Sequence, residues 1–193
     1  MRLTLPLAAM LAAGCAAAPP LPEPVSATAE ARREALQARE AWALAGRVAV
    51  AAAGEGATAS LDWRQSSGSS ELALRGPFGA RALSVTVTGS DISLSDGEGR
   101  LDGEDAHIYL ENQLGADLPV SQLRYWVLGV PAPDAPFEET AGPDGLPERL
   151  VQLGWVIVFE RYRPVDGLWL PSRITAEAGT TRVRLAVSRW ELP

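Results

Sequence analysis

Cys15 is the only cysteine of the chain, and the residues before it follow a definite order. Arg2 gives a positive start, Leu3–Leu11 form a short apolar run, and Ala12–Gly14 are small. This order is typical of a bacterial lipobox, whose cysteine thiol receives a diacylglyceryl group and whose new amino terminus, after cleavage, receives a further acyl chain. The alternative is a plain secretory signal that is cut within Ala16–Ala18 and leaves Cys15 without a role. Cys15 is therefore the candidate lipidation site.

A lipobox divides the chain into a signal peptide over residues 1–14, a lipidated tether over residues 15–29 and a single domain over residues 30–193. The apolar run of the signal is too short to span a bilayer. The four prolines of the tether favour a stiff, extended segment. Two or more acyl chains make a stable anchor. Because Ala16 and not Asp follows the cysteine, we expect the anchor in the outer membrane and the domain on its periplasmic face.

Other residues that could do chemistry do not form a catalytic or metal-binding set. His107 is the only histidine, and the one cysteine is Cys15, the candidate lipidation site. His107 therefore has no His or Cys partner with which it could bind a metal ion. Asp96, Glu98, Asp102, Glu104 and Asp105 form an acidic cluster, but Arg100 stands where a calcium loop needs a ligand. No nucleophile elbow, phosphate-binding glycine loop or dinucleotide fingerprint occurs. We expect a protein that is not an enzyme and needs no metal or cofactor.

The composition suits one globular domain. Of 193 residues, 47% are hydrophobic and 21% are charged, which indicates neither disorder nor a polytopic membrane protein. The net charge is −7 and all 17 cations are arginines. Nucleic-acid binding requires a concentrated basic face, so we expect no nucleic-acid partner.

Alternation of apolar and polar residues predicts that most of the domain is antiparallel β-sheet. About ten or eleven strands are expected, in an all-β fold with a small helical insert: an unclosed barrel whose insert can serve as a lid. The strands are expected over residues 44–65 with a turn at 54–56, and over 71–75, 83–88, 92–94, 100–101, 150–162, 170–178 and 181–192. Helices are expected over 29–42, 104–114 and 119–128, and a long loop with one short strand near Phe137 over 131–148.

The stretch Gly76-Pro77-Phe78-Gly79 is the turn of a hairpin, because two permissive glycines bracket a proline that cannot donate to a sheet. Phe78 is unusual there, since loop tips are normally polar. Arg75 and Arg81 flank it. Two interpretations stay open: Phe78 folds back into the core, or it protrudes as an apolar contact.

The inward phases of the strands also identify candidates for the wall of an interior cavity. Apolar faces are needed equally by a hollow and by a solid barrel, so the sequence does not separate the two. The candidates are Trp63, Leu72, Leu74, Leu83, Val85, Val87, Ile92, Leu94, Ile157, Val183 and Leu185, with Trp126 from the helical insert.

Several motifs together resemble the LolB family of outer-membrane lipoprotein receptors. The stretches that carry the resemblance are Trp42–Val50, Leu61–Gln65, Gly76–Gly79, Leu123–Pro131, Gln152–Trp155, Leu170–Arg173 and Val183–Trp190. The resemblance implies an unclosed barrel of about eleven strands with helices over its mouth. It also implies that Phe78 protrudes and serves membrane insertion, although the family's usual residue there is Leu.

The activity implied by the resemblance is to take acylated lipoproteins from a periplasmic LolA-type carrier and to insert them into the outer membrane. The partners would be the carrier, the lipoproteins and outer-membrane phospholipid, with the receptor itself a monomer. Two alternatives from other classes are a lipocalin-like binder of small apolar ligands and a structural envelope-assembly lipoprotein with a solid barrel.

Overall fold

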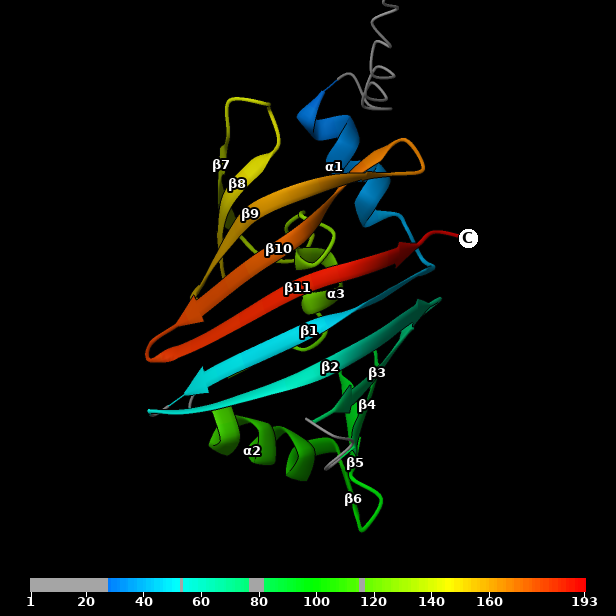
Figure 1. The fold of residues 1–193 in the computed structure, drawn as a ribbon, viewed down its shortest axis with the longest axis vertical. Coiled ribbons are helices and arrows are strands. Elements are labelled where there is room, and N and C mark those ends of the chain that lie inside the picture. Colours follow the sequence, from blue (N-terminus) through cyan, green and yellow to red (C-terminus); the bar gives the residue numbers. More distant parts are fainter. Residues whose placement is uncertain (1–27, 53, 77–81, 115–116) are drawn as a thin grey trace, which may run out of the picture.

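The structure is a computed structural model that describes residues 28–52, 54–76, 82–114 and 117–193. Eleven strands form one antiparallel sheet in the order β6-β5-β4-β3-β2-β1-β11-β10-β9-β8-β7 (Figure 1). The strands are β1 (Trp42–Ala52), β2 (Glu55–Ser66), β3 (Ser69–Arg75), β4 (Ala82–Thr88), β5 (Asp91–Ser95), β6 (Arg100–Asp102), β7 (Phe137–Ala141), β8 (Pro147–Gln152), β9 (Trp155–Val165), β10 (Leu168–Ala178) and β11 (Thr181–Glu191). Three helices accompany them: α1 (Ala29–Gln37), α2 (Gly103–Leu114) and α3 (Leu123–Trp126).

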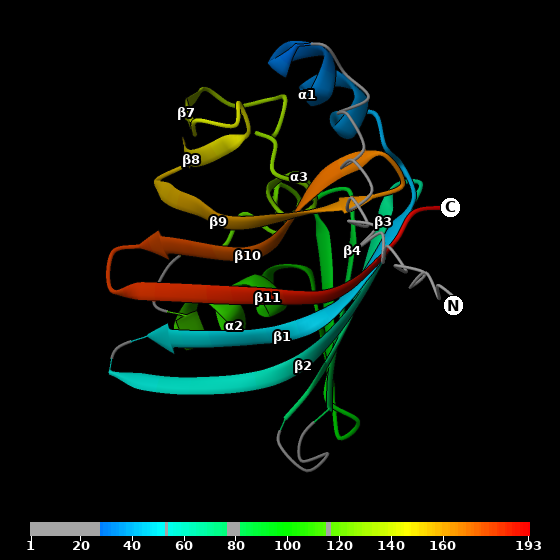
Figure 2. The same ribbon diagram turned by 45° about the horizontal axis from the view of Figure 1, so that its top comes forward.

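The sheet curls without closing, as the sequence predicted. β6 and β7 are its two edges. In Figure 2, β9, β10, β11, β1 and β2 cross the view, β3 and β4 turn behind them, and α2 and α3 lie in the space between. The curl therefore gives the sheet an inner face that the helical segments cover and an outer face that they leave free.

The first and last strands of the chain meet at the centre of the sheet. β1 pairs with β11, and the register shifts between Ala45 and Gly46. A Cβ atom on Gly46 would lie 2.4 Å from the carbonyl oxygen of Ala186, which is far inside van der Waals contact. Gly46 is therefore required for the close approach of these two strands at the bulge.

Alternating burial on the strands explains why they form a two-faced sheet. On β2, Leu61 and Trp63 are buried, whereas Asp62 and Arg64, which alternate with them, are exposed. β11 repeats the pattern. Because successive side chains of a strand point to opposite faces, one face collects the apolar residues and the other the polar ones.

The N-terminal helix is shorter than predicted and is fastened by a buried arginine. α1 ends at Gln37, and Trp42 begins β1 instead of ending the helix. Arg32 is 8% exposed; it donates hydrogen bonds to the carbonyl oxygens of Gly129, at 3.1 Å, and Trp169, at 3.0 Å. Desolvation lowers the pKa of Arg32. These bonds dock α1 on the body of the domain.

Three other boundaries differ from the prediction. The helix expected over residues 119–128 is only the single turn of α3, with turns on either side. The loop expected over 131–148 contains its expected short strand near Phe137, which is β7, and also the first residues of β8, which were not expected there. The strand expected over 150–162 is two strands, because Leu153 and Gly154 both have positive φ and form the turn between β8 and β9. Pro147 begins β8, where a missing backbone N–H is tolerated.

Candidate functional site

The predicted cavity residues all lie on the apolar side of the sheet or against it. Eight are buried: Trp63, Val85, Val87, Ile92, Leu94, Trp126, Ile157 and Leu185. Four are half-buried: Leu72, Leu74, Leu83 and Val183. The structure thus brings the set together as one apolar lining, while their role as acyl-chain contacts stays a prediction.

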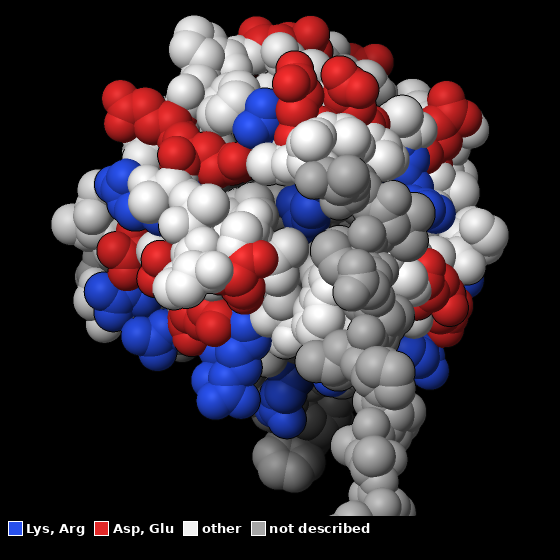
Figure 3. Space-filling model, turned by 90° about the horizontal axis from the view of Figure 1, so that it is seen from above, with Lys and Arg blue, Asp and Glu red and all other residues white. Residues whose placement is uncertain are grey.

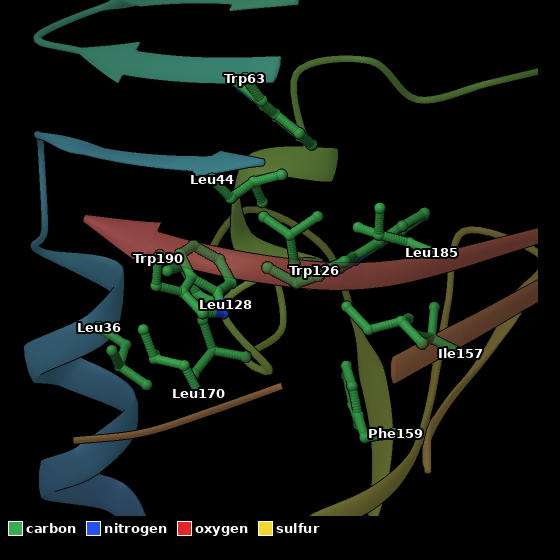
Figure 4. Close-up of a cluster of buried hydrophobic side chains, with 14 of the residues drawn as sticks. Leu36, Leu44, Trp63, Trp126, Leu128, Ile157, Phe159, Leu170, Leu185 and Trp190 are labelled. Carbon is green, nitrogen blue, oxygen red and sulfur yellow. The ribbon is translucent and has the colours of Figure 1, made fainter. Parts of the chain in front are cut away.

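This lining is divided into two clusters. The larger one is built between β1, β2, β9–β11 and α3, and Figure 4 shows ten of its side chains meeting there. The smaller one is formed by β4 and β5 with Ala106 of α2 and Val120. Leu72, Leu74 and Leu118 are half-buried and pack against both clusters. We call these three residues the seam.

Most of the tryptophans fill the larger cluster. The ring of Trp42 lies 5.1 Å from that of Trp63 and 5.6 Å from that of Trp190, and the rings of Trp126 and Trp155 are 6.3 Å apart. This agrees with the default that tryptophans fill a core. The indole N–H groups of Trp42 and Trp63 are buried without an acceptor within the described residues.

Gln152 fixes the α3 segment against the sheet. Its side-chain oxygen accepts hydrogen bonds from the indole N–H of Trp126, at 2.8 Å, and from the backbone N–H of Ala132, at 2.9 Å. Its amide nitrogen donates to the carbonyl oxygens of Ala132, at 2.8 Å, and Ala135, at 2.9 Å. Gln152 is 1% exposed, and its bonds to Trp126 and Ala132 are buried. No pattern in the sequence indicates this role, because a single buried glutamine has no periodicity.

α2 covers the smaller cluster more lightly. It lies against β5, β6 and β1, and it buries Ala106 completely, with Leu110 partly buried beside the cluster. Ile108 and Tyr109 on its outer side are 47% and 42% exposed. Only α2 therefore fits the lid that the sequence predicted from two helices, because α3 is held inside by Gln152.

A pocket of about 340 Å³ opens beside the α3 segment. Gln65, Ser70 and Val87 line it from the sheet, and Gln122 and Tyr125 line it from the α3 side. Gln65 and Ser70 are buried and hydrogen-bonded to each other. The pocket therefore has a mixed lining, in which Val87 and Tyr125 lie beside amide and hydroxyl groups.

A second groove, of about 320 Å³, lies across β11, β1, β2, β3 and β4. Its lining includes the charged, exposed residues Asp62, Arg64, Glu71, Arg189 and Glu191. These residues belong to the outer face, so this groove is not the interior of the barrel.

The acidic cluster has a structural explanation. Asp96 accepts hydrogen bonds from the backbone N–H groups of Glu98 and Gly99 and so closes a turn. Asp102 pairs with Arg100 at 2.9 Å. Within the described residues, no group of three or more His, Cys, Asp or Glu side chains could hold a metal ion. His107 lies 3.5 Å from the carbonyl oxygen of Ser90, at the limit of hydrogen bonding.

Two predicted sites fall outside the residues that the structure describes: the lipidation site Cys15 and the tip residue Phe78. The strands that lead to the tip are described, and β3 pairs with β4 up to Arg75 and Ala82. The hairpin that presents the tip is thus confirmed. No helix in the described residues is long and apolar enough to cross a membrane.

The fold defines the class of protein: an unclosed antiparallel half-barrel with an apolar inner face. It is the fold of a LolA superfamily protein from Nitrosomonas europaea, whose crystal structure matches with a TM-score of 0.55 and 12% identity. The match covers 87% of this chain and 94% of that one.

The sequence comparisons identify the family within that class. The family model described as "Outer membrane lipoprotein LolB" matches residues 40–190. The outer-membrane lipoprotein LolB of Chromohalobacter salexigens is 36% identical over 98% of this chain and 89% of its own length. The outer-membrane lipoprotein LolB of Halorhodospira halophila is also 36% identical, over 95% of this chain and 91% of its own length. The chain belongs to the LolB family of outer-membrane lipoproteins.

Proposed function

We propose that this outer-membrane lipoprotein accepts acylated lipoproteins from a soluble periplasmic carrier of the LolA type and releases them into the outer membrane. The observation that carries the proposal is the apolar inner face, with a seam between two clusters and a light cover over the smaller one. Family membership does not favour the two alternatives, a lipocalin-like binder and a structural lipoprotein.

The cargo itself requires such a face. Three acyl chains of sixteen or so carbons hold about 45 methylene groups, and exposing each to water costs about 0.8 kcal/mol, about 35 kcal/mol in all. Even half of this cost forbids release into the periplasm. Transfer must therefore pass from one apolar site to the next and then to the bilayer. It needs no covalent step and no nucleotide if each site holds the chains more favourably than the one before.

The seam is where the chains enter. Opening the seam separates the smaller cluster from the larger one. Exposing a few side chains there costs about 1.5–3 kcal/mol each, which is far less than the free energy gained by burying the acyl chains. Leu72 and Leu74 of β3 then contact the chains. The ester carbonyl groups of the cargo would supply the acceptor that the buried indole N–H of Trp63 lacks in the described structure.

The lipid anchor and the tip complete the proposal. The domain organisation is a signal peptide over 1–14, a tether over 15–29 and one domain from residue 30. Cys15 carries the acyl chains that hold the protein at the membrane, and Phe78 protrudes to aim the mouth at the bilayer. Burying one phenyl group contributes only about 2–3 kcal/mol, so Phe78 is not the anchor. The protein acts as a monomer, and outer-membrane phospholipid is its acceptor.

The proposal is tested by placing one polar amide on either side of β3. Leu74 and Ala73 are neighbours that face opposite sides of the sheet, and Leu74 belongs to the seam. We expect Leu74→Asn to lower acceptance of a labelled lipoprotein from its carrier at least about tenfold, because an amide loses well over 1.4 kcal/mol when it is buried among acyl chains. Ala73→Asn should leave acceptance unchanged. Equal acceptance by the two variants would contradict an acyl site on the inner face.

A further inference from the structure

The outer face of the central sheet carries exposed arginines that have no carboxylate partner. Arg47 on β1, Arg161 on β9, Arg173 on β10 and Arg184 on β11 are all exposed. No ion pair within the described residues includes any of them. We call these four residues the arginine face.

The register of the sheet places these side chains next to one another. Arg161 and Arg173 are direct cross-strand partners. Ala186 of β11 pairs with Arg173 on one side and with Arg47 on the other, so the three arginines form a row across four adjacent strands. Neighbouring strands are about 4.8 Å apart. Like charges that lie directly opposite one another destabilise a sheet, so the pairing of Arg161 with Arg173 is a cost to the isolated protein.

Other arginines on the same face do have carboxylate partners. Arg182 of β11 forms an ion pair with Glu177 of β10, and Arg189 forms one with Glu191 at 3.0 Å. The arginine face lacks such partners although the chain as a whole has a net charge of −7. In Figure 3 arginine side chains, in blue, gather along the lower margin, on the side of the sheet that faces the viewer in Figure 1, with acidic side chains beside them. An unneutralised cationic row on an acidic protein indicates an anionic partner.

We propose that the arginine face docks on the anionic phospholipid headgroups of the membrane in which the protein is anchored. Guanidinium groups bind phosphate oxygens with two parallel hydrogen bonds, and the outer-membrane location keeps such a surface within reach. The row also leads toward the tip: Ser60 of β2 pairs with Arg47 and with Arg75, the last residue of β3. Arg75 is ion-paired with Asp62 at 2.7 Å, so the unpaired arginines end at Arg47, two strands from the base of the Phe78 loop.

Docking on this face sets the orientation of the molecule. The arginine face and the apolar lining lie on opposite sides of one sheet. With the arginines on the headgroups, the inner face with α3 against it points away from the bilayer (Figure 1). This is the orientation for acceptance, in which a soluble carrier can reach the seam. Delivery through the mouth then requires the molecule to turn about the Phe78 loop. The inference goes beyond the transfer of cargo, because headgroup binding requires neither cargo nor carrier.

The test measures vesicle binding without the acyl anchor. The mature chain over residues 15–193, with Cys15→Ala, is sedimented with phosphatidylcholine vesicles, with and without phosphatidylglycerol. Each arginine near an anionic surface contributes about fivefold in partitioning. We therefore expect Arg173→Gln to weaken binding about fivefold, and the combined Arg47→Gln, Arg161→Gln and Arg173→Gln variant about 100-fold. Arg100→Gln, which also removes one exposed arginine but from the edge strand β6, should bind as the parent does.

Several results would overturn the proposal. They are equal binding to vesicles with and without phosphatidylglycerol, binding that does not fall with salt, and full binding by the combined glutamine variant. Loss of binding by the variant with lysine at all three positions, which keeps the three charges, would also contradict a charge-driven contact. Binding to an acidic protein but not to the vesicles would assign the face to that partner instead. Because the assay contains no lipoprotein, its failure is distinct from failure of the transfer function.

Discussion

Trp126 donates its indole N–H to the side-chain oxygen of Gln152 at 2.8 Å, and this bond joins the α3 segment to β8. Both side chains are buried, at 3% and 1% exposure. The same glutamine holds Ala132 and Ala135, so the segment is tied down on both sides of Pro131. The α3 segment is therefore part of the wall of the apolar interior, and α2 is the element free to act as its cover.

Replacing Gln152 by leucine should destabilise the protein by about 2–5 kcal/mol. Leucine has nearly the same size but leaves the indole N–H of Trp126 and the backbone groups of Ala132 buried without partners, at about 1–3 kcal/mol for each group left unsatisfied. Chemical denaturation measures the change. Gln113→Leu, on the exposed side of α2, should stay within about 0.5 kcal/mol of the parent. Equal stability of the two variants would show that the Gln152 network contributes nothing.

Gly46→Ala should destabilise the centre of the sheet by more than about 2 kcal/mol. The new methyl group would meet the carbonyl oxygen of Ala186 at 2.4 Å, and a backbone atom in a paired strand has no room to move away. Gly56→Ala is the matched control, since its Cβ would have only one neighbour within 4 Å, at 3.7 Å. Thermal unfolding of both variants decides: a Gly46→Ala protein as stable as Gly56→Ala would refute the close approach at the bulge.

Tyr162→Phe should change how stability depends on alkaline pH. Burial raises the pKa of the Tyr162 phenol, and its hydroxyl donates to the carbonyl oxygen of Pro147 at 2.8 Å. Below the ordinary pKa of about 10 both folded and unfolded states keep the proton. Above it the unfolded state ionises first, so stability falls as pH rises.

At neutral pH the phenylalanine variant should be about 1 kcal/mol less stable, because it lacks the hydrogen bond. That difference should shrink as the pH rises above about 10, since the variant has no phenol to ionise. Denaturation curves at neutral pH and above about pH 10 measure this difference in stability. Tyr109→Phe is the control, because Tyr109 is exposed. A constant difference across the range would contradict the burial of the phenol.

Phe78→Glu should slow delivery of lipoprotein to vesicles at least about tenfold and leave acceptance from the carrier unchanged. A carboxylate cannot replace a phenyl group that gains about 2–3 kcal/mol in the bilayer. Leu153→Glu is the control, because Leu153 is an apolar residue 48% exposed at the turn of another hairpin. If the two variants deliver lipoprotein at the same rate, the Phe78 loop has no special role at the membrane.

Much of the fold could be predicted from strand periodicity, and the errors have tertiary causes. The first helix is predicted to reach Trp42 because the residues before Trp42 are good helix formers. In the structure Trp42 joins β1, where it packs against Trp63 and Trp190. Residues 126–132 are all buried, so they show no alternation from which a wall segment could be predicted.

The apolar lining could be predicted from the alternation of apolar and polar residues along each strand. The arginine face could not be predicted in this way. Alternation along β11 places Arg182 and Arg184 on the face opposite Val183, but it does not say which arginines of other strands lie beside them. The adjacency of Arg161 and Arg173 depends on the register between β9 and β10, which includes two irregularities near Arg173. A register of this kind is a property of paired strands and cannot be inferred from either strand alone.

The account depends most directly on acceptance of cargo at the inner face. The decisive measurement mixes a labelled lipoprotein, bound to its soluble carrier, with the Cys15→Ala form of this protein in the absence of any nucleotide, and follows the label. We predict that the label moves to this protein in a complex that stays soluble, and that it moves on to vesicles when they are added. Label that stays with the carrier, or that passes to vesicles equally well without this protein, would contradict the account.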